Sequence, residues 1–244
     1  MNLTTPDFKN CSSCPIRHRA VCARCEPDEL LELEHMKYYR SFNAGQTMIW
    51  AGDRMEFVAS VVEGVATLSQ TMEDGRTQMV GLLLPSDFIG RPGRDTAPYN
   101  VTAVSNVTVC CFRKRPFEQL LLSTPNVAQR LLEMSLDELD AARDWMLLLG
   151  RKTAREKIAT LLTIIVRRDS EIQQVLEKGR ATLTLPLTRE AMADYLGLTL
   201  ETVSRQISAL KREGVIELEG TRQLTVPDIR RLVAEAGDEA ERLL

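Results

Sequence analysis

The sequence predicts an α+β protein with an N-terminal antiparallel β domain, a long helix and a C-terminal winged helix-turn-helix. Three observations support this order. Turn residues recur about every ten positions over 41–113, apolar residues then recur at three- and four-residue steps, and two short helices with cap residues follow near the C-terminus. The chain has 244 residues, of which 44% are hydrophobic, so it can form two domains with separate cores.

The N-terminal segment is marked by its cysteines. Four of the six lie close together and two are adjacent much later in the chain: Cys11, Cys14, Cys22, Cys25, Cys110 and Cys111. No apolar stretch typical of a signal peptide or a membrane span occurs, so we expect a cytoplasmic protein without a membrane partner. In that reducing compartment, clustered thiols favour metal binding or redox sensing over disulfides.

The spacing of the first four cysteines is Cys-x2-Cys-x7-Cys-x2-Cys. Two zinc knuckles are usually separated by about 12 to 20 residues, so seven is short for a zinc site. An iron-sulfur cluster can take a fourth thiolate from far along the chain, and Cys110 and Cys111 are available. The residues therefore favour an iron-sulfur cluster, with structural zinc and redox-active or incidental thiols as alternatives.

The elements after the cysteines follow from local patterns. Residues 27–36 have acidic side chains in the first turn of an expected helix, where the helix dipole favours them. Short apolar runs separated by turn residues over 41–113 predict antiparallel strands in a sandwich or barrel. Residues 116–168 have helical periodicity, and the polar stretch 169–182 is expected to form a linker or a partly formed helix and loop.

The long helix carries an apolar stripe that resembles a coiled-coil seam, which predicts a homodimer interface. Its members recur at three- and four-residue steps or their multiples: Leu132, Leu136, Leu139 and Met146. Acidic residues beside the seam, Asp140 and Asp144 among them, either repel across the dimer or form a solvated face. The alternative is an ordinary helix packed on its own domain.

Residues 187–210 have the pattern of a helix-turn-helix. Thr188 and Thr199 are placed to cap two helices, and Gly197 supplies the turn between them. In the second helix, Val203, Ile207 and Leu210 fall on one face and are expected to pack inward.

The opposite face of that second helix predicts contact with DNA bases. Glu201, Ser204 and Arg205 share this face, and these side chain types can read base edges in the major groove. Thr199 begins the same helix, and Arg222, at the tip of a hairpin after it, is placed to contact phosphate. Residues 151–231 have a net charge of +4, from 15 Lys and Arg against 11 Asp and Glu, although the whole chain has −3. The alternative for this face is a solvated helix surface.

These motifs together resemble the Crp/Fnr superfamily of dimeric transcription regulators, and within it the oxygen-sensing Fnr proteins of α-proteobacteria. The resemblance covers essentially the whole chain. It is most specific in 197–205, then in Cys11-x2-Cys14-x7-Cys22, then in Val109-Cys110-Cys-Phe112. It implies a cyclic-nucleotide-binding-like β-roll, although residues 88–96 lack the Phe-Gly-Glu and Arg-Ser elements of nucleotide-binding relatives, so no cyclic nucleotide is expected.

The resemblance further implies a 4Fe-4S cluster bound by Cys11, Cys14, Cys22 and Cys110, with Cys25 and Cys111 as alternates. Such a cluster stabilises the homodimer that binds palindromic TTGAT-type sites without oxygen, and RNA polymerase is the expected further partner. The expected divisions are a cluster-binding segment, a β-roll sensor domain, a dimerisation helix with hinge, and the winged helix-turn-helix: 1–26, 27–122, 123–168 and 169–244.

Two rival functions remain at this point. One is a small-molecule-gated regulator of the same fold with a structural zinc site. The other is an iron-sulfur redox protein, which is disfavoured because no GxGxxG segment or catalytic acid and base pair accompanies the cysteines. We therefore expect no enzymatic activity.

Overall fold

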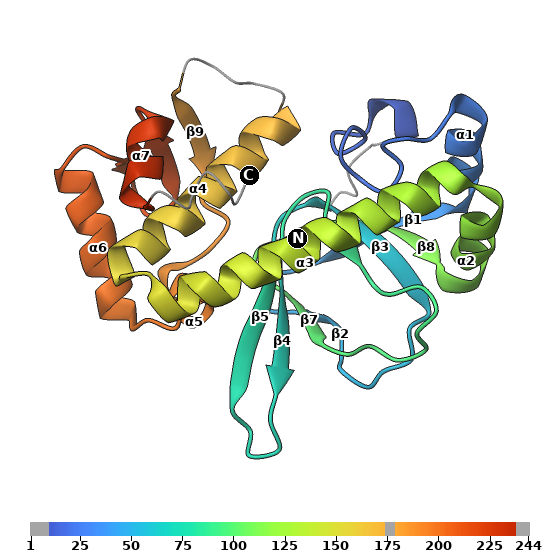
Figure 1. Cartoon of the computed structure of the whole chain (residues 1–244), viewed down its shortest axis with the longest axis horizontal. Helices are drawn as coiled ribbons and strands as arrows, with labels where there is room; N and C mark the ends of the chain where they lie inside the picture. Colours follow the sequence, from blue (N-terminus) through green and yellow to red (C-terminus); the bar gives the residue numbers. More distant parts are fainter. Residues whose placement is uncertain (1–9, 174–178, 238–244) are drawn as a thin grey trace. The chain divides into compact units, whose positions relative to one another are not determined.

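The computed structural model describes residues 10–173 and 179–237 (Figure 1). It divides into two compact units, 1–138 and 139–244. The first contains the cysteines and the β domain, and the second contains the helix-turn-helix. Each is described separately below.

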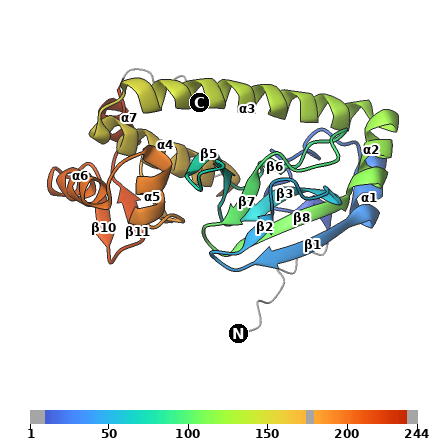
Figure 2. The same cartoon turned by 90° about the horizontal axis from the view of Figure 1, so that it is seen from below.

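The N-terminal unit is built on two four-stranded antiparallel sheets, ordered β1-β8-β3-β6 and β2-β7-β4-β5 (Figure 2). A short 3-10 helix, η1 (Cys11–Ser13), and α1 (Pro27–Met36) precede them. The strands are β1 (Lys37–Phe42), β2 (Thr47–Ile49), β3 (Phe57–Glu63), β4 (Ala66–Thr71), β5 (Thr77–Leu83), β6 (Phe88–Ile89), β7 (Asn100–Ala103) and β8 (Val107–Arg113). The expected antiparallel β domain and the helix over 27–36 are confirmed.

Strands β3 and β8 pair with each other and are buried on both faces. Successive side chains of a strand point to opposite faces. One face of the pair, including Ala59, Val61, Val109 and Cys111, contributes to the apolar core of the β domain. The other face carries Ser60 and Cys110 and is covered by the N-terminal segment.

Three helices follow the β domain: α2 (Lys114–Ser123), α3 (Pro125–Arg151) and α4 (Ala154–Gln173). The break before α3 falls at Pro125, which lacks an N–H and disfavours helical backbone at the residue before it. At the start of α4, Glu156 Oε2 accepts hydrogen bonds from the N–H and hydroxyl of Thr153, at 2.7 and 2.8 Å. This cap fixes a new helix start after a gap of two residues, 152–153.

The stretch 169–182, expected as a linker or as a partly formed helix and loop, is helix at one described end and strand at the other. Residues 169–173 continue α4, and 181–182 begin strand β9 (Ala181–Thr184). Ser170 is buried, and its hydroxyl donates to the Val166 carbonyl at 2.8 Å, so a polar side chain is satisfied inside the helix. Part of the expected linker, residues 174–178, lies outside the described residues.

The C-terminal unit places α4 against β9 and three helices. Its remaining elements are α5 (Arg189–Leu196), α6 (Leu200–Arg212), β10 (Glu217–Glu219), β11 (Gln223–Val226) and α7 (Ile229–Glu235). The strands form one antiparallel sheet ordered β10-β11-β9. Arg155 joins α4 to the rest of the unit through ion pairs with Glu213 and Glu235, both at 2.6 Å.

The local signals of the helix-turn-helix are confirmed. Thr188 Oγ1 accepts from the Ala191 N–H, and Thr199 Oγ1 accepts from the Thr202 N–H. Gly197 has φ +62°, in the left-handed region that favours glycine. The inward residues of α6 are buried: Val203, Ile207 and Leu210.

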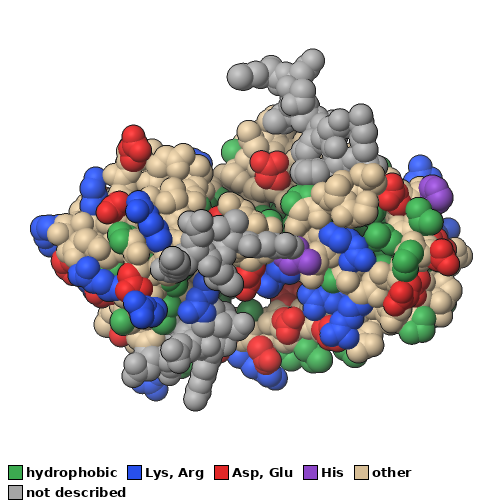
Figure 3. Space-filling view, turned by 90° about the horizontal axis from the view of Figure 1, so that it is seen from above, with side chains coloured by type: hydrophobic (Ala, Val, Ile, Leu, Met, Phe, Trp, Pro, Cys, Tyr) green, Lys and Arg blue, Asp and Glu red, His purple; other side chains and the backbone are tan. Residues whose placement is uncertain are grey.

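No helix of the described residues is long and apolar enough to cross a lipid bilayer. On the face shown in Figure 3, basic and acidic side chains are both spread over the surface.

Two glycines with similar backbone conformations provide a test of the packing of the β domain. Gly64 has φ +84°, and a Cβ there would lie 2.0 Å from the Asn106 carbonyl oxygen; Gly75 has φ +86° and nothing within 4 Å. We expect Gly75→Ala to lower the free energy of unfolding by about 1 kcal/mol, from backbone strain alone. Gly64→Ala adds a clash with backbone and should cost at least about 3 kcal/mol. Urea unfolding of both variants checks this, and equal losses would contradict the packing described here.

Candidate functional site

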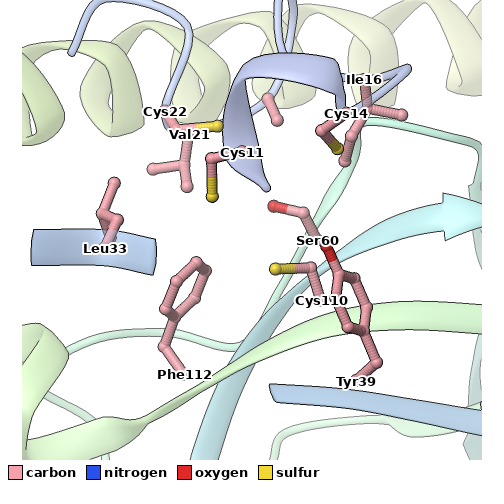
Figure 4. Close-up of a pocket in the computed structure, with 11 residues that line it drawn as sticks. Cys11, Cys14, Ile16, Val21, Cys22, Leu33, Tyr39, Ser60, Cys110 and Phe112 are labelled. Atoms are coloured by element: carbon pink, nitrogen blue, oxygen red, sulfur yellow. The ribbon is translucent and has the colours of Figure 1, made fainter. Parts of the chain in front are cut away.

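Four of the six cysteines line one pocket of the N-terminal unit (Figure 4). Cys11 lies in η1, Cys14 and Cys22 follow in the same N-terminal segment, and Cys110 lies on β8. The rest of the lining is mostly apolar: Ile16, Ala20, Val21, Leu33, Phe112, Tyr39 and Ser60. The pocket thus joins thiols from two parts of the sequence that lie far apart.

The pleat of β8 decides which of the adjacent cysteines reaches the pocket. Cys110 is opposite Tyr39 of β1 and Ser60 of β3, and all three side chains line the pocket. Cys111 points to the other face, is fully buried and belongs to the apolar core. All six cysteines are free thiols in the structure.

Cys25 is buried but does not line the pocket. Its carbonyl oxygen accepts a hydrogen bond from the Arg17 guanidinium at 3.1 Å. In this structure Cys25 therefore helps to close the N-terminal segment on itself, and Cys22 is the one of this pair that borders the pocket.

Cys11 is held by two charged side chains. Glu34 Oε2 of α1 accepts from the Cys11 N–H at 2.9 Å, and the Lys37 ammonium of β1 donates to Cys11 Sγ at 3.3 Å. The same Lys37 nitrogen lies 5.5 Å from the centre of the Tyr39 ring. A cation beside the sulfur favours its thiolate form.

Burial opposes ionisation of these thiols. It raises the pKa of Cys22 to about 12, with the nearby Arg17 charge acting in the opposite direction. Burial likewise raises the pKa of Cys11, Cys14 and Cys110 above the usual thiol range. The thiols are therefore protonated near neutral pH, and a metal group must displace these protons as it binds.

The donor set fits a thiolate-bound metal group in its chemistry. Four soft sulfur ligands suit zinc or an iron-sulfur cluster. The buried Ser60 hydroxyl, which lines the same pocket, has no hydrogen-bond partner within residues 10–173 and 179–237. The cavity itself is about 20 Å³, so a multi-iron cluster needs the N-terminal segment to move outward. Among the described residues, no three His, Cys, Asp or Glu side chains are already arranged to hold a metal ion.

The residues expected to contact DNA lie on and near α6. Glu201 and Arg205 are exposed, and Ser204 is half-buried on the same helix. The Thr199 hydroxyl caps α6 through its 3.2 Å contact with the Thr202 N–H. Arg222 is exposed in the turn between β10 and β11. These side chains are available to a ligand.

The apolar stripe of α3 is exposed in the single chain. The exposed fractions of its side chains are 60%, 53%, 46% and 67% for Leu132, Leu136, Leu139 and Met146. Asp140 is exposed and forms an ion pair with Arg143 at 2.9 Å, and Asp144 is half-buried. Apolar side chains repeated in this way along one helix are typical of an interaction surface.

Sequence reasoning did not identify four side chains around the cysteines: Glu34, Lys37, Tyr39 and Ser60. Ser60 had a signal, because it is the one polar residue within the run Phe57–Val62. Glu34, Lys37 and Tyr39 had no such signal, because they come close to the cysteines only when β1 pairs with β8.

Comparison with known families identifies two matching models. Residues 39–124 match the cyclic nucleotide-binding domain, and residues 127–235 match the Crp-like helix-turn-helix domain.

Individual relatives match most of the chain. The transcriptional activator protein FnrL of Cereibacter sphaeroides is 68% identical over 231 residues, covering 95% of this chain and 93% of the relative. A probable transcriptional activator of Rhizobium leguminosarum is 39% identical over 237 residues, covering 96% and 92%. The solved structure of FixK2 from Bradyrhizobium japonicum has a TM-score of 0.70 and 32% identity, covering 81% of this chain and 96% of that one.

Proposed function

The chain belongs to the Crp/Fnr family of DNA-binding transcription regulators, and from this we propose that it is an activator that responds to oxygen through an iron-sulfur cluster. Membership of this family supports a dimeric transcription factor with the expected fold, rather than an enzyme. The proposal adds a 4Fe-4S cluster as cofactor, palindromic TTGAT-type sites as targets, RNA polymerase as a partner and the cytoplasm as location.

The observation that carries this proposal is the pocket shared by Cys11, Cys14, Cys22 and Cys110. When bound there, a cluster supplies iron-thiolate bonds that link the N-terminal segment to β8 and that oxygen can destroy. The alternates Cys25 and Cys111 do not line the pocket, which favours the four named ligands.

The N-terminal segment is tied directly to α3. The Arg130 guanidinium donates to the Arg19 carbonyl at 2.7 Å, and Arg24 forms an ion pair with Glu133 at 2.9 Å. Both contacts lie within one helical turn of Leu132, a member of the exposed apolar stripe. Fixing the segment against β8 therefore also fixes the beginning of this stripe, around Leu132.

We assign the stripe of Leu132, Leu136, Leu139 and Met146 to the homodimer interface. A two-fold axis would pair each stripe with its copy and present two α6 helices to half-sites one DNA turn apart. A shift from mostly monomer to mostly dimer needs a few kcal/mol, which ligation coupled to local ordering can provide.

In the DNA complex, the exposed face of α6 reads the bases. Arg205 is suited to guanine, Glu201 to the amino group of cytosine, and Ser204 to a base or a phosphate. Thr199 adds its helix cap at the same end of α6, and Arg222 at the hairpin tip is suited to phosphate. We assign no cyclic nucleotide to the β domain, because residues 88–96 lack the Phe-Gly-Glu and Arg-Ser elements.

The two adjacent cysteines test the cluster. After anaerobic reconstitution, Cys110→Ser should lose bound iron and sulfide, because its thiol borders the pocket. Cys111→Ala should keep both and lose about 1 kcal/mol of stability, because it leaves a gap in the core. Iron and sulfide analysis with urea unfolding checks both. Stoichiometric zinc without sulfide in the wild-type protein would instead support the zinc-containing alternative.

The Arg130 contact tests the coupling between segment and helix. Arg130→Gln should retain iron and sulfide but raise the dissociation constant of the cluster-loaded dimer about tenfold, through loss of a charged hydrogen bond. Sedimentation velocity without oxygen measures this. Arg76→Gln is the control, because Arg76 forms an exposed ion pair with Asp74 in the β4-β5 turn. The coupling is wrong if both variants dimerise equally well.

The two arginines of the DNA-binding unit should behave differently. Arg205→Ala should cost about 1 to 3 kcal/mol per half-site and relax discrimination at one base pair. Arg222→Ala should weaken binding to all sequences alike and reduce the salt dependence by nearly one unit per half-site. Binding isotherms on a TTGAT palindrome and its single-base variants, at several salt concentrations, separate these effects.

Glu201 gives a sharper test of base reading in the same isotherms. A carboxylate near DNA is repelled by phosphate, so Glu201→Ala should broaden sequence preference without weakening non-specific binding. A uniform loss on every sequence would show that Glu201 has a structural role.

A further inference from the structure

Ser60 is a buried polar residue in an apolar strand. It lies in β3, its side chain is 2% exposed, and its hydroxyl has no hydrogen-bond partner among the residues that the structure describes. Its neighbours Val58, Ala59, Val61 and Val62 are all apolar and buried. Buried hydroxyl groups nearly always have a partner, so an exception calls for an explanation.

The position of Ser60 shows where that partner belongs. Ser60 and Tyr39 lie opposite Cys110 from the two strands that flank β8. All three line the cysteine pocket, and Figure 4 shows the Ser60 hydroxyl pointing into the space that the cysteine side chains border. The Cys110 sulfur does not accept from it, even though directly opposite residues of paired strands are close neighbours.

No backbone carbonyl of the described residues accepts from the Ser60 hydroxyl, although β3 pairs with β6 on one side and with β8 on the other. An alanine at this position would fill nearly the same space without burying a polar group. The hydroxyl is therefore explained only by an acceptor that enters the pocket.

We propose that Ser60 is a positioning residue of the cysteine site, donating a hydrogen bond through its hydroxyl to a sulfur atom of the bound iron-sulfur group. This inference rests on the function proposed above. Hydrogen bonds to the sulfur atoms raise the reduction potential of such clusters, and outer groups of this kind hold the ligands in place. Ser60 thereby makes the site easier to reduce and slows its loss in air.

The test compares Ser60→Ala with Thr67→Val, first without metal. Thr67 is a matched control, because it is also buried in the β domain but its hydroxyl donates to the Thr102 carbonyl at 3.4 Å. In metal-free, reduced protein, Ser60→Ala should unfold at the same or a higher urea concentration than wild type. Thr67→Val should unfold at a lower one. A loss in Ser60→Ala equal to that in Thr67→Val would show a partner within the protein and overturn the proposal.

The second measurement uses protein reconstituted anaerobically with iron and sulfide. Ser60→Ala should bind both but show a lower midpoint potential and a several-fold faster loss of visible absorbance in air. Thr67→Val and Ser60→Thr, which retains the hydroxyl, should match wild type in both readouts.

The outcomes separate this inference from the proposed function. If wild type binds no iron and sulfide, the proposed function fails and the role of Ser60 fails with it. If wild type binds them and Ser60→Ala has an unchanged potential and decay rate, only the role of Ser60 is wrong.

Discussion

Strands β3 and β8 pair along most of their length, and each is buried on both faces. One face contributes to the core between the two sheets, and the N-terminal segment covers the other. The two faces of the strand pair therefore have different roles. The inner face stabilises the β domain, and the outer face places the Cys110 thiol and the Ser60 hydroxyl in the cysteine pocket. The cysteine site therefore depends on a strand pair that must remain rigid for the β domain to fold.

The same arrangement connects the pocket to the rest of the chain. The N-terminal segment lies between β8 and α3, with Cys110 on one side and the Arg130 and Glu133 contacts on the other. A change in how tightly the N-terminal segment is bound therefore acts directly on α3, the helix whose apolar side chains are exposed. The function that we propose uses these contacts to link loss of the cluster to dissociation of the dimer.

Local signals predicted much of this structure. The caps Thr188 and Thr199 and the turn at Gly197 were identified because their chemistry depends on residues close in sequence. Whether the helix continues through Ser170 was left open, because a polar residue such as serine is also typical of a linker and its burial is known only from the structure. Spacing also left open which cysteine of each pair faces the pocket. For Cys110 and Cys111 this depends on strand register, and for Cys22 and Cys25 it depends on how the N-terminal segment folds. Glu34, Lys37 and Tyr39 lie beside the cysteines because β1 pairs with β8, and no local sequence pattern predicts this pairing.

The adjacent cysteines of β8 have one more consequence. A shift of register by one residue reverses the direction of every side chain in a strand. In most strands such a slip would remove a ligand from its site. Because Cys110 and Cys111 are consecutive, β8 presents one sulfur to each face in either register. A one-residue deletion before this strand would bring Cys111 to the position opposite Tyr39 and Ser60, so a sulfur would still face the pocket there. A one-residue insertion would bring Val109 to that position, so the adjacent pair protects the pocket against a shift in one direction only.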